Sequence, residues 1–228
     1  MSDYLTDVQL LESELARVEQ AFRGLASGDW RRPTLLQPPG DTLPPWTIFE
    51  LAGHLDIAVG GVTRMLIASQ QDGQVGRDRV SFFIFPRSQV APVFYDYAYT
   101  MVQGKSPGQM ADVLAESFTR TITEARATSP DVIGLFEYDG DEVLIRLGEF
   151  VASRMVEAVV HGLDLTDALG QDPVATPEGV AMTASILDEL LARRTVPGRP
   201  ADLTDDMAWI RAASGRSPHA DPRLPLLG

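Results

Sequence analysis

The sequence predicts an all-α protein: a four-helix bundle with one long crossover, a small β-hairpin before the fourth long helix and a short C-terminal extension. Three observations support this fold. Four long segments carry apolar residues at the spacing of a helix. Capping-box patterns mark where two of these segments begin. Between the second and the third, residues 74–105 show little helical periodicity, which leaves a long crossover.

The first helix is expected over residues 4–27, where apolar side chains recur every three or four positions before a Gly-Asp pair and a proline-rich loop. The second is expected over residues 48–70. Thr47 can cap its N-terminus, and Glu50 stands three residues further on as the reciprocal partner. Both segments are long enough to serve as bundle helices.

The later elements follow from local signals of the same kind. Ser106, Pro107 and Gln109 predict the start of the third long helix, and Asp139-Gly140 predicts a hairpin turn. The expected elements are a short helix near residues 90–102, the third long helix at 106–127, the hairpin at 135–147, the fourth long helix up to Ala168 with Gly170 closing it, and extension helices at 177–194 and 204–213. We therefore expect a bundle domain over residues 1–172, with residues 173–228 forming a short helical extension packed on it.

The composition excludes several classes of protein. The net charge of −13 repels nucleic acid and anionic membrane surfaces, so neither partner is expected. No apolar run approaches the length needed to span a bilayer. The absence of cysteine excludes disulfides, zinc ribbons and a cysteine nucleophile. The first nine residues lack a basic-then-apolar leader, so the expected location is the cytoplasm.

The fourth long helix carries a row of ionisable residues. Glu157 and His161 are four residues apart and therefore share one face, on which Arg154 and Asp164 also fall. The other directions of this helix are apolar, which indicates that the helix is buried and that the row points inward. Buried charges must be paired or bound to a metal ion.

His54 lies among apolar residues of the second helix, beside the Gly60-Gly61 pair that would permit close approach of another backbone. If this helix faces the fourth, His54, Glu157 and His161 form a two-histidine, one-carboxylate metal site with open positions. The alternative is a hydrogen-bonded core histidine and a separate Glu–His pair. The third histidine, His219, lies in a proline-rich tail and is given no role.

Two stretches of this sequence resemble a known family. Residues 45–55, P-W-T-I-F-E-L-A-G-H-L, resemble the W-T-x-x-E-L-x-x-H-L segment of the DinB-like, mycothiol-dependent maleylpyruvate isomerase family. Residues 150–165 resemble its second motif, R-x-x-E-x-x-x-H-x-x-D-L. The ending Trp209-Ile210-Arg211 with Gly215-Arg216 resembles the short C-terminal extension of many actinobacterial members. The resemblance implies a DinB-like four-helix bundle in which His54, Glu157 and His161 bind zinc or a similar divalent ion.

The resemblance also implies a function: a metal-dependent transferase or isomerase that uses mycothiol, a small cellular thiol, against a small electrophile. Nickel, manganese or iron would suit the same ligands. In place of the isomerase's second domain only a short extension is expected, so maleylpyruvate is not implied as the substrate. Arg154 or Arg216 could hold the thiol, and Arg154 could equally support Glu157.

Two alternatives remain open from the sequence. One is a metal-activated hydrolase, with Asp164 or Glu50 as the general base. The other is a bundle that binds a metal or a ligand without catalysing a reaction. Such a bundle could form a homodimer. The aromatic residues between Phe82 and Tyr99 could roof a substrate pocket or plug the end of the bundle.

Overall fold

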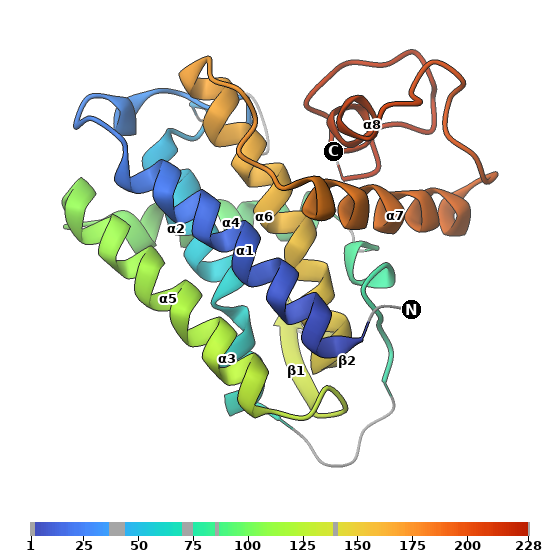
Figure 1. The fold of residues 1–228 in the computed structure, drawn as a ribbon, viewed down its shortest axis with the longest axis horizontal. Coiled ribbons are helices and arrows are strands. Elements are labelled where there is room, and N and C mark those ends of the chain that lie inside the picture. Colours follow the sequence, from blue (N-terminus) through green and yellow to red (C-terminus); the bar gives the residue numbers. More distant parts are fainter. Residues whose placement is uncertain (1–2, 37–43, 70–74, 85–86, 139–140, 228) are drawn as a thin grey trace.

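Figure 1 shows the computed structural model, which describes residues 3–36, 44–69, 75–84, 87–138 and 141–227. Four helices form the bundle: α1 (Tyr4–Arg23), α2 (Ile48–Val59), α5 (Pro107–Ala127) and α6 (Leu147–Leu169). Helices α1 and α2 each contact both α5 and α6, so the four form a closed ring around one core. The predicted four-helix bundle is confirmed.

Helix α6 lies at the centre of the molecule because nearly every side of it is apolar. It contacts α1, α2 and the C-terminal helix α7, which together cover most of its surface. Val151, Met155, Val159 and Leu163 are fully buried. Gly170 ends the helix in the left-handed conformation, with φ of 67°. Several polar side chains on α6 are therefore buried as well and need partners: Ser153, Arg154, His161, Asp164 and Thr166.

Helix α2 begins as predicted and ends earlier than predicted. Thr47 caps it, accepting a hydrogen bond from the Phe49 amide at 3.3 Å, while the Glu50 carboxylate accepts one from the Thr47 amide at 2.8 Å. The helix stops at Gly60, and a separate helix α3 (Gly61–Ile67) follows. The prediction of one helix over residues 48–70 is wrong. A Cβ at Gly60 would stand 2.6 Å from the Ser117 hydroxyl of α5, so this glycine lets the chain turn against α5.

The crossover contains α3, a short 3₁₀ helix η2 (Ser81–Phe83) and helix α4 (Arg87–Val102), which starts somewhat before the predicted residue 90. Helix α4 packs closely on α2. The closest approach is at Gly53, where an added Cβ would lie 2.6 Å from the backbone oxygen of Ala98. This contact places α4 over the face of α2 that carries His54.

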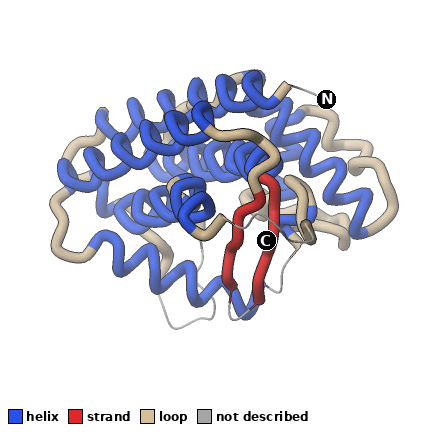
Figure 2. The backbone as a smooth tube through the Cα atoms, turned by 90° about the horizontal axis from the view of Figure 1, so that it is seen from below, coloured by secondary structure: helices blue, strands red, loops and turns tan. Residues whose placement is uncertain are grey.

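A small antiparallel hairpin precedes α6, as predicted. Strand β1 (Ile133–Tyr138) pairs with β2 (Asp141–Arg146), with Ile133 opposite Arg146. Figure 2 shows this hairpin beside the helices. The predicted turn at residues 139–140 lies outside the described residues.

The C-terminal extension is held against the bundle by α7 (Pro177–Arg194), which contacts α6 and α1, and by α8 (Asp206–Ala213), which packs on α7. Glu14 of α1 is fully buried and accepts hydrogen bonds from the Thr176 amide (2.9 Å) and hydroxyl (2.7 Å) at the start of α7. The division of the chain at residue 172 stays a prediction. Among the described helices, none is long and apolar enough to cross a membrane.

Candidate metal centre

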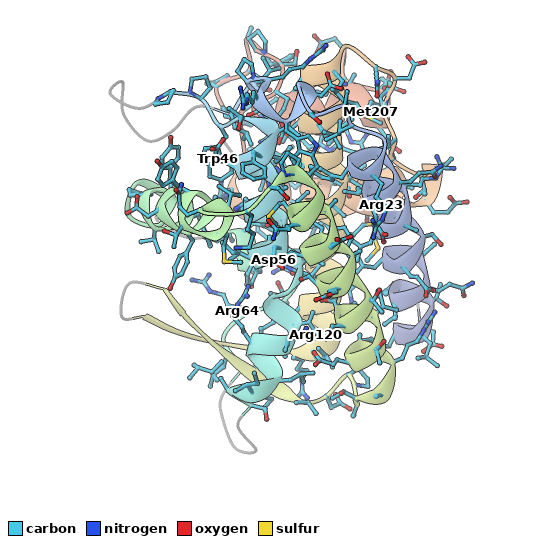
Figure 3. The ribbon with its side chains drawn as sticks, turned by 90° about the vertical axis from the view of Figure 1, so that its left-hand side faces the viewer. Arg23, Trp46, Asp56, Arg64, Arg120 and Met207 are labelled. Carbon is cyan, nitrogen blue, oxygen red and sulfur yellow. The ribbon has the colours of Figure 1, made fainter. Side chains whose placement is uncertain are left out.

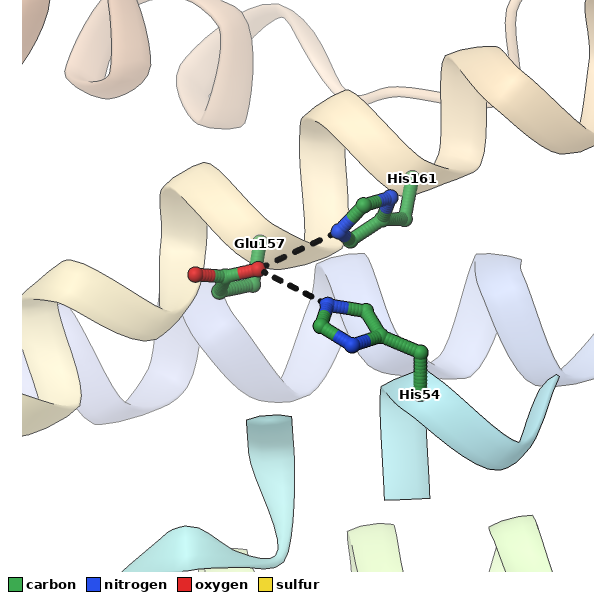
Figure 4. Close-up of side chains that lie close together, drawn as sticks. All are labelled: His54, Glu157 and His161. Atoms are coloured by element: carbon green, nitrogen blue, oxygen red, sulfur yellow. Dashed lines mark ion pairs between the residues drawn. The ribbon is translucent and has the colours of Figure 1, made fainter. Parts of the chain in front are cut away.

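Three predicted site residues converge where α2 faces α6. Figure 4 shows His54 from α2 pointing at Glu157 and His161, one turn apart on α6. The Glu157 Oε2 atom lies 3.2 Å from His161 Nε2 and 3.6 Å from His54 Nε2. One donor atom from each residue lies within 4.8 Å of the others. The structure thus brings together the two imidazoles and the carboxylate that the sequence singled out.

The three side chains differ in their access to water. His54 and His161 are buried, at 8% and 7% exposure. The Glu157 side chain keeps 18% of its surface exposed, so the centre is most open beside this carboxylate. An open side next to three donors is what a site with vacant coordination positions requires.

The protonation chemistry of the site favours a cation. Burial alone would raise the pKa of Glu157, but hydrogen bonds from His161 and His54 and the charge of Arg154 lower its pKa well below the ordinary value. Burial lowers the pKa of His54. His161 Nδ1 faces the Asp164 carboxylate at 2.8 Å. Because a carboxylate only accepts, Nδ1 must carry a hydrogen, and the Nε2 of a neutral His161 turns its lone pair toward Glu157.

Two electron-rich atoms at 3.2 Å need a positive charge between them. For His161 without a metal ion, that charge is a proton: burial works against it, yet the bonds to Asp164 and Glu157 raise the pKa of the imidazole. A divalent ion would replace the proton. Two imidazole nitrogens and one carboxylate oxygen form a common ligand set for zinc, so the residues present fit a metal ion.

Arg154 lies beside the Glu157 carboxylate, one turn earlier on α6. Its guanidinium lies 3.9 Å from Glu157 and donates a hydrogen bond of 2.9 Å to the Ala58 carbonyl of α2. The same group lies over the rings of Phe82 and Phe150, at 4.6 and 4.2 Å from their centroids. Arg154 is therefore surrounded by protein partners, and its charge adds to the hydrogen bonds from His161 and His54 that lower the pKa of Glu157.

Arg216 also lies near the site, through Asp164. It donates hydrogen bonds of 2.9 and 2.7 Å to the two oxygens of Asp164, which in turn binds His161. The sequence placed Asp164 on the face of α6 that carries Glu157 and His161, but it did not pair Asp164 with Arg216. The one signal for Arg216 was the resemblance of Gly215-Arg216 to the endings of related chains.

The predicted aromatic segment divides into two parts. Phe94 of α4 contacts His54 edge-on, with ring centroids 5.8 Å apart, and Trp46 lies against the same imidazole at 5.0 Å. Phe82 and Phe83 are buried in the main core instead. The view in Figure 3 shows Trp46 at the side of the bundle where α4 crosses α2. His219 is not part of this cluster: its Nε2 atom lies 3.2 Å from Oδ2 of Asp202 in the C-terminal extension.

The sequence profile of the family described as the mycothiol maleylpyruvate isomerase N-terminal domain matches residues 11–166. The chain belongs to this family. The matched range contains His54, Glu157 and His161 and ends before Arg216. Trp46, which flanks His54, lies within it as well.

Two crystal structures of a mycothiol-dependent maleylpyruvate isomerase share the fold of this family member. A mutant form matches with a TM-score of 0.57 and another crystal structure with 0.55, each at 15% identity over 85% of this chain and 73% of that chain. YfiT from Bacillus subtilis, described as a probable metal-dependent hydrolase with an unusual four-helix bundle topology, gives a TM-score of 0.42 at 16% identity, over 75% of this chain and 91% of that chain. No curated protein matches the chain.

Proposed function

We propose that this protein is a metal-dependent enzyme that joins a small cellular thiol, mycothiol, to a small electrophile, as a transferase or an isomerase. The observation that carries the proposal is the convergence of His54, Glu157 and His161 on one partly open point. Membership of a family named for a mycothiol-dependent isomerase supports the choice of thiol. The chain contains no cysteine, so any sulfur nucleophile must arrive on a small molecule.

The chain's own residues prepare the site for that chemistry. A divalent ion, with zinc the first choice, would lower the pKa of a thiol that reaches it and so make the sulfur nucleophilic near neutral pH. Hydrogen bonds from His161 and His54, together with the charge of Arg154, favour the carboxylate form of Glu157, and Asp164 orients His161. Trp46 and Phe94 cover the imidazole of His54 and keep water from that side.

The hydrolase alternative needs a general base beside the open position. The two carboxylates considered for that role both have other partners. Asp164 is fully buried and binds Arg216 and His161. Glu50 accepts hydrogen bonds from Thr47 in the cap of α2. These partners favour the thiol reaction, in which the nucleophile needs no separate strong base.

Metal analysis of purified protein tests the ligand assignment. Wild-type protein should carry about one divalent ion per chain, and His161→Ala should lose most of it while keeping the helical far-UV spectrum, because packing of α6 depends on its apolar sides. His219→Ala is the matched control, since His219 bonds within the extension. Unchanged metal content in His161→Ala would show that His161 is not a ligand.

A panel of electrophiles tests the reaction. Consumption of a bimane or an activated double bond should require mycothiol and should fall to background in His161→Ala. Turnover of a hydrolysable ester without any thiol would favour the hydrolase. Metal binding without turnover of any compound would indicate a binding protein. The cytoplasmic location and the homodimer stay predictions, which fractionation and light scattering can check.

A further inference from the structure

The C-terminal extension reaches the candidate metal centre through Arg216. Its guanidinium binds both oxygens of Asp164, at 2.9 and 2.7 Å, and Asp164 Oδ2 lies 2.8 Å from His161 Nδ1. The Asp164 side chain is completely buried, and that of Arg216 is 8% exposed. His161, Asp164 and Arg216 thus form a series of contacts. Arg216 lies in the extension, beyond the residues 11–166 that the family profile covers.

The turn that carries Arg216 is fixed by local backbone structure. Helix α8 ends in a Schellman motif: the Arg216 amide donates to the Arg211 carbonyl at 2.8 Å and the Gly215 amide to the Ala212 carbonyl at 3.2 Å. Gly215 takes the left-handed conformation that this motif needs, with φ of 78°. Arg216 Nη1 also donates to the Ser214 carbonyl at 2.6 Å. The side chain is thus held in one direction, toward α6.

Asp164 depends on this arginine. An ionised carboxylate without water or a cationic partner is costly inside a protein. Asp164 has two bound partners among the described residues, and only Arg216 has a permanent positive charge. Removing Arg216 would remove both hydrogen bonds that hold the Asp164 carboxylate in place. Its oxygens could then turn away from His161 Nδ1–H, which would weaken that contact.

The orientation of His161 depends in turn on Asp164. A carboxylate on Nδ1 fixes the tautomer that presents Nε2, the atom that faces Glu157. The other imidazole has no such support, because His54 Nδ1 is buried without a hydrogen-bond partner among the described residues. The centre therefore has one ligand whose ring is preset and one whose ring is held by packing against Trp46 and Phe94.

We propose that Arg216 is a positioning residue of the metal centre: through Asp164 it presets the ring of His161, so the C-terminal extension controls how tightly the bundle holds its metal ion. This inference depends on the metal centre of the proposed function. It does not depend on which thiol or electrophile reacts there. It also assigns Arg216 a role that differs from binding the thiol, because its Nε, Nη1 and Nη2 atoms all have protein partners.

The test is the dissociation constant for zinc, measured by competition with a chromophoric chelator, in Arg216→Gln and in a matched control. Arg211→Gln is that control, because Arg211 also joins α8 to α6, through Asp167 at 2.8 Å, but touches no candidate ligand. Arg216→Gln should weaken zinc binding about 10–100-fold, as loss of such outer partners typically does. Arg211→Gln should leave it within about twofold.

Two further measurements separate positioning from loss of stability. Arg216→Gln combined with Asp164→Asn should bind zinc no more weakly than Asp164→Asn alone, since both changes break one pathway. Cobalt-loaded Arg216→Gln should show an altered visible spectrum, which reports ligand geometry. If Arg216→Gln does not fold, Arg216→Lys replaces it and should still bind zinc several-fold more weakly than wild type.

The outcomes distinguish this inference from the proposed function. Wild-type protein that binds no metal contradicts the proposed function itself. Wild-type protein that binds zinc, with equal affinity in the folded Arg216 variant, overturns only the positioning role. Additive losses in the double variant would overturn it as well, because they would show that Arg216 acts independently of Asp164.

Discussion

Replacing Gly53 with alanine should destabilise the protein, although the same change usually stabilises a helix. In a helix interior, alanine is favoured over glycine by about 1 kcal/mol. At Gly53, however, the new Cβ would meet the Ala98 backbone oxygen at 2.6 Å and Val102 Cγ1 at 2.9 Å. The first of these contacts is with a backbone atom, which cannot rotate away on its own as the end of a flexible side chain can. The whole of α4 must therefore shift away from α2. Overpacking of this kind costs about 1–3 kcal/mol.

The matched control is Gly108→Ala in the first turn of α5, where an added Cβ meets nothing within 4 Å. This variant should be more stable than wild type, by about 0.5–1 kcal/mol. Gly53→Ala should then be about 2 kcal/mol less stable than Gly108→Ala, which corresponds to about 4–8 °C in Tm for a chain of this size. Thermal unfolding followed by circular dichroism measures the difference. If the two variants melt together, the close packing of α4 on α2 is refuted.

Two other predictions concern stability. Burial works against ionisation of Asp78, but hydrogen bonds from Ser81 and Arg193 lower its pKa to about 2 from the ordinary 3.8. Its stabilisation is therefore present above pH 3.8 and is lost as the pH falls toward 2, so Asp78→Asn should flatten the acid dependence of the urea midpoint; an unchanged slope would contradict this. Thr47→Ala should cost about 1 kcal/mol of unfolding free energy by removing the cap of α2, and Thr47→Ser should restore most of it; equal melting temperatures for the two would argue against the cap.

Features set by neighbours along the chain could be predicted from the sequence. Glu157 and His161 share a face because helical geometry alone places them one turn apart. The start of α2 follows from Thr47 and Glu50, which bond to each other locally. The burial of α6 follows from its apolar sides, and this burial indicated that its ionisable row points inward. His54 joined the set through the expected facing of two helices and the resemblance to a family.

Features set by tertiary contacts could not be predicted in the same way. At Gly60, where α2 ends, an added Cβ would meet Ser117 of α5, a contact that no local pattern shows. The close approach of another backbone was expected at the Gly60-Gly61 pair, but α4 makes it at Gly53. Arg216 binds Asp164 although the two are 52 residues apart in the sequence, because the packing of α8 and the turn after it bring them together. Sequence spacing carries no information about such a pair.

The order in which these residues are synthesised limits when the centre can form. His54 is made early, the α6 residues about a hundred positions later, and Arg216 only after α8. At about 5–20 residues per second, roughly 10–30 s separate the first ligand from the arginine that orients the last. A growing chain that has produced α6 but not the extension already has all three candidate ligands and Asp164, but Asp164 still lacks Arg216. If Arg216 positions His161 as proposed, tight metal binding would come only after α7 and α8 have been made and packed.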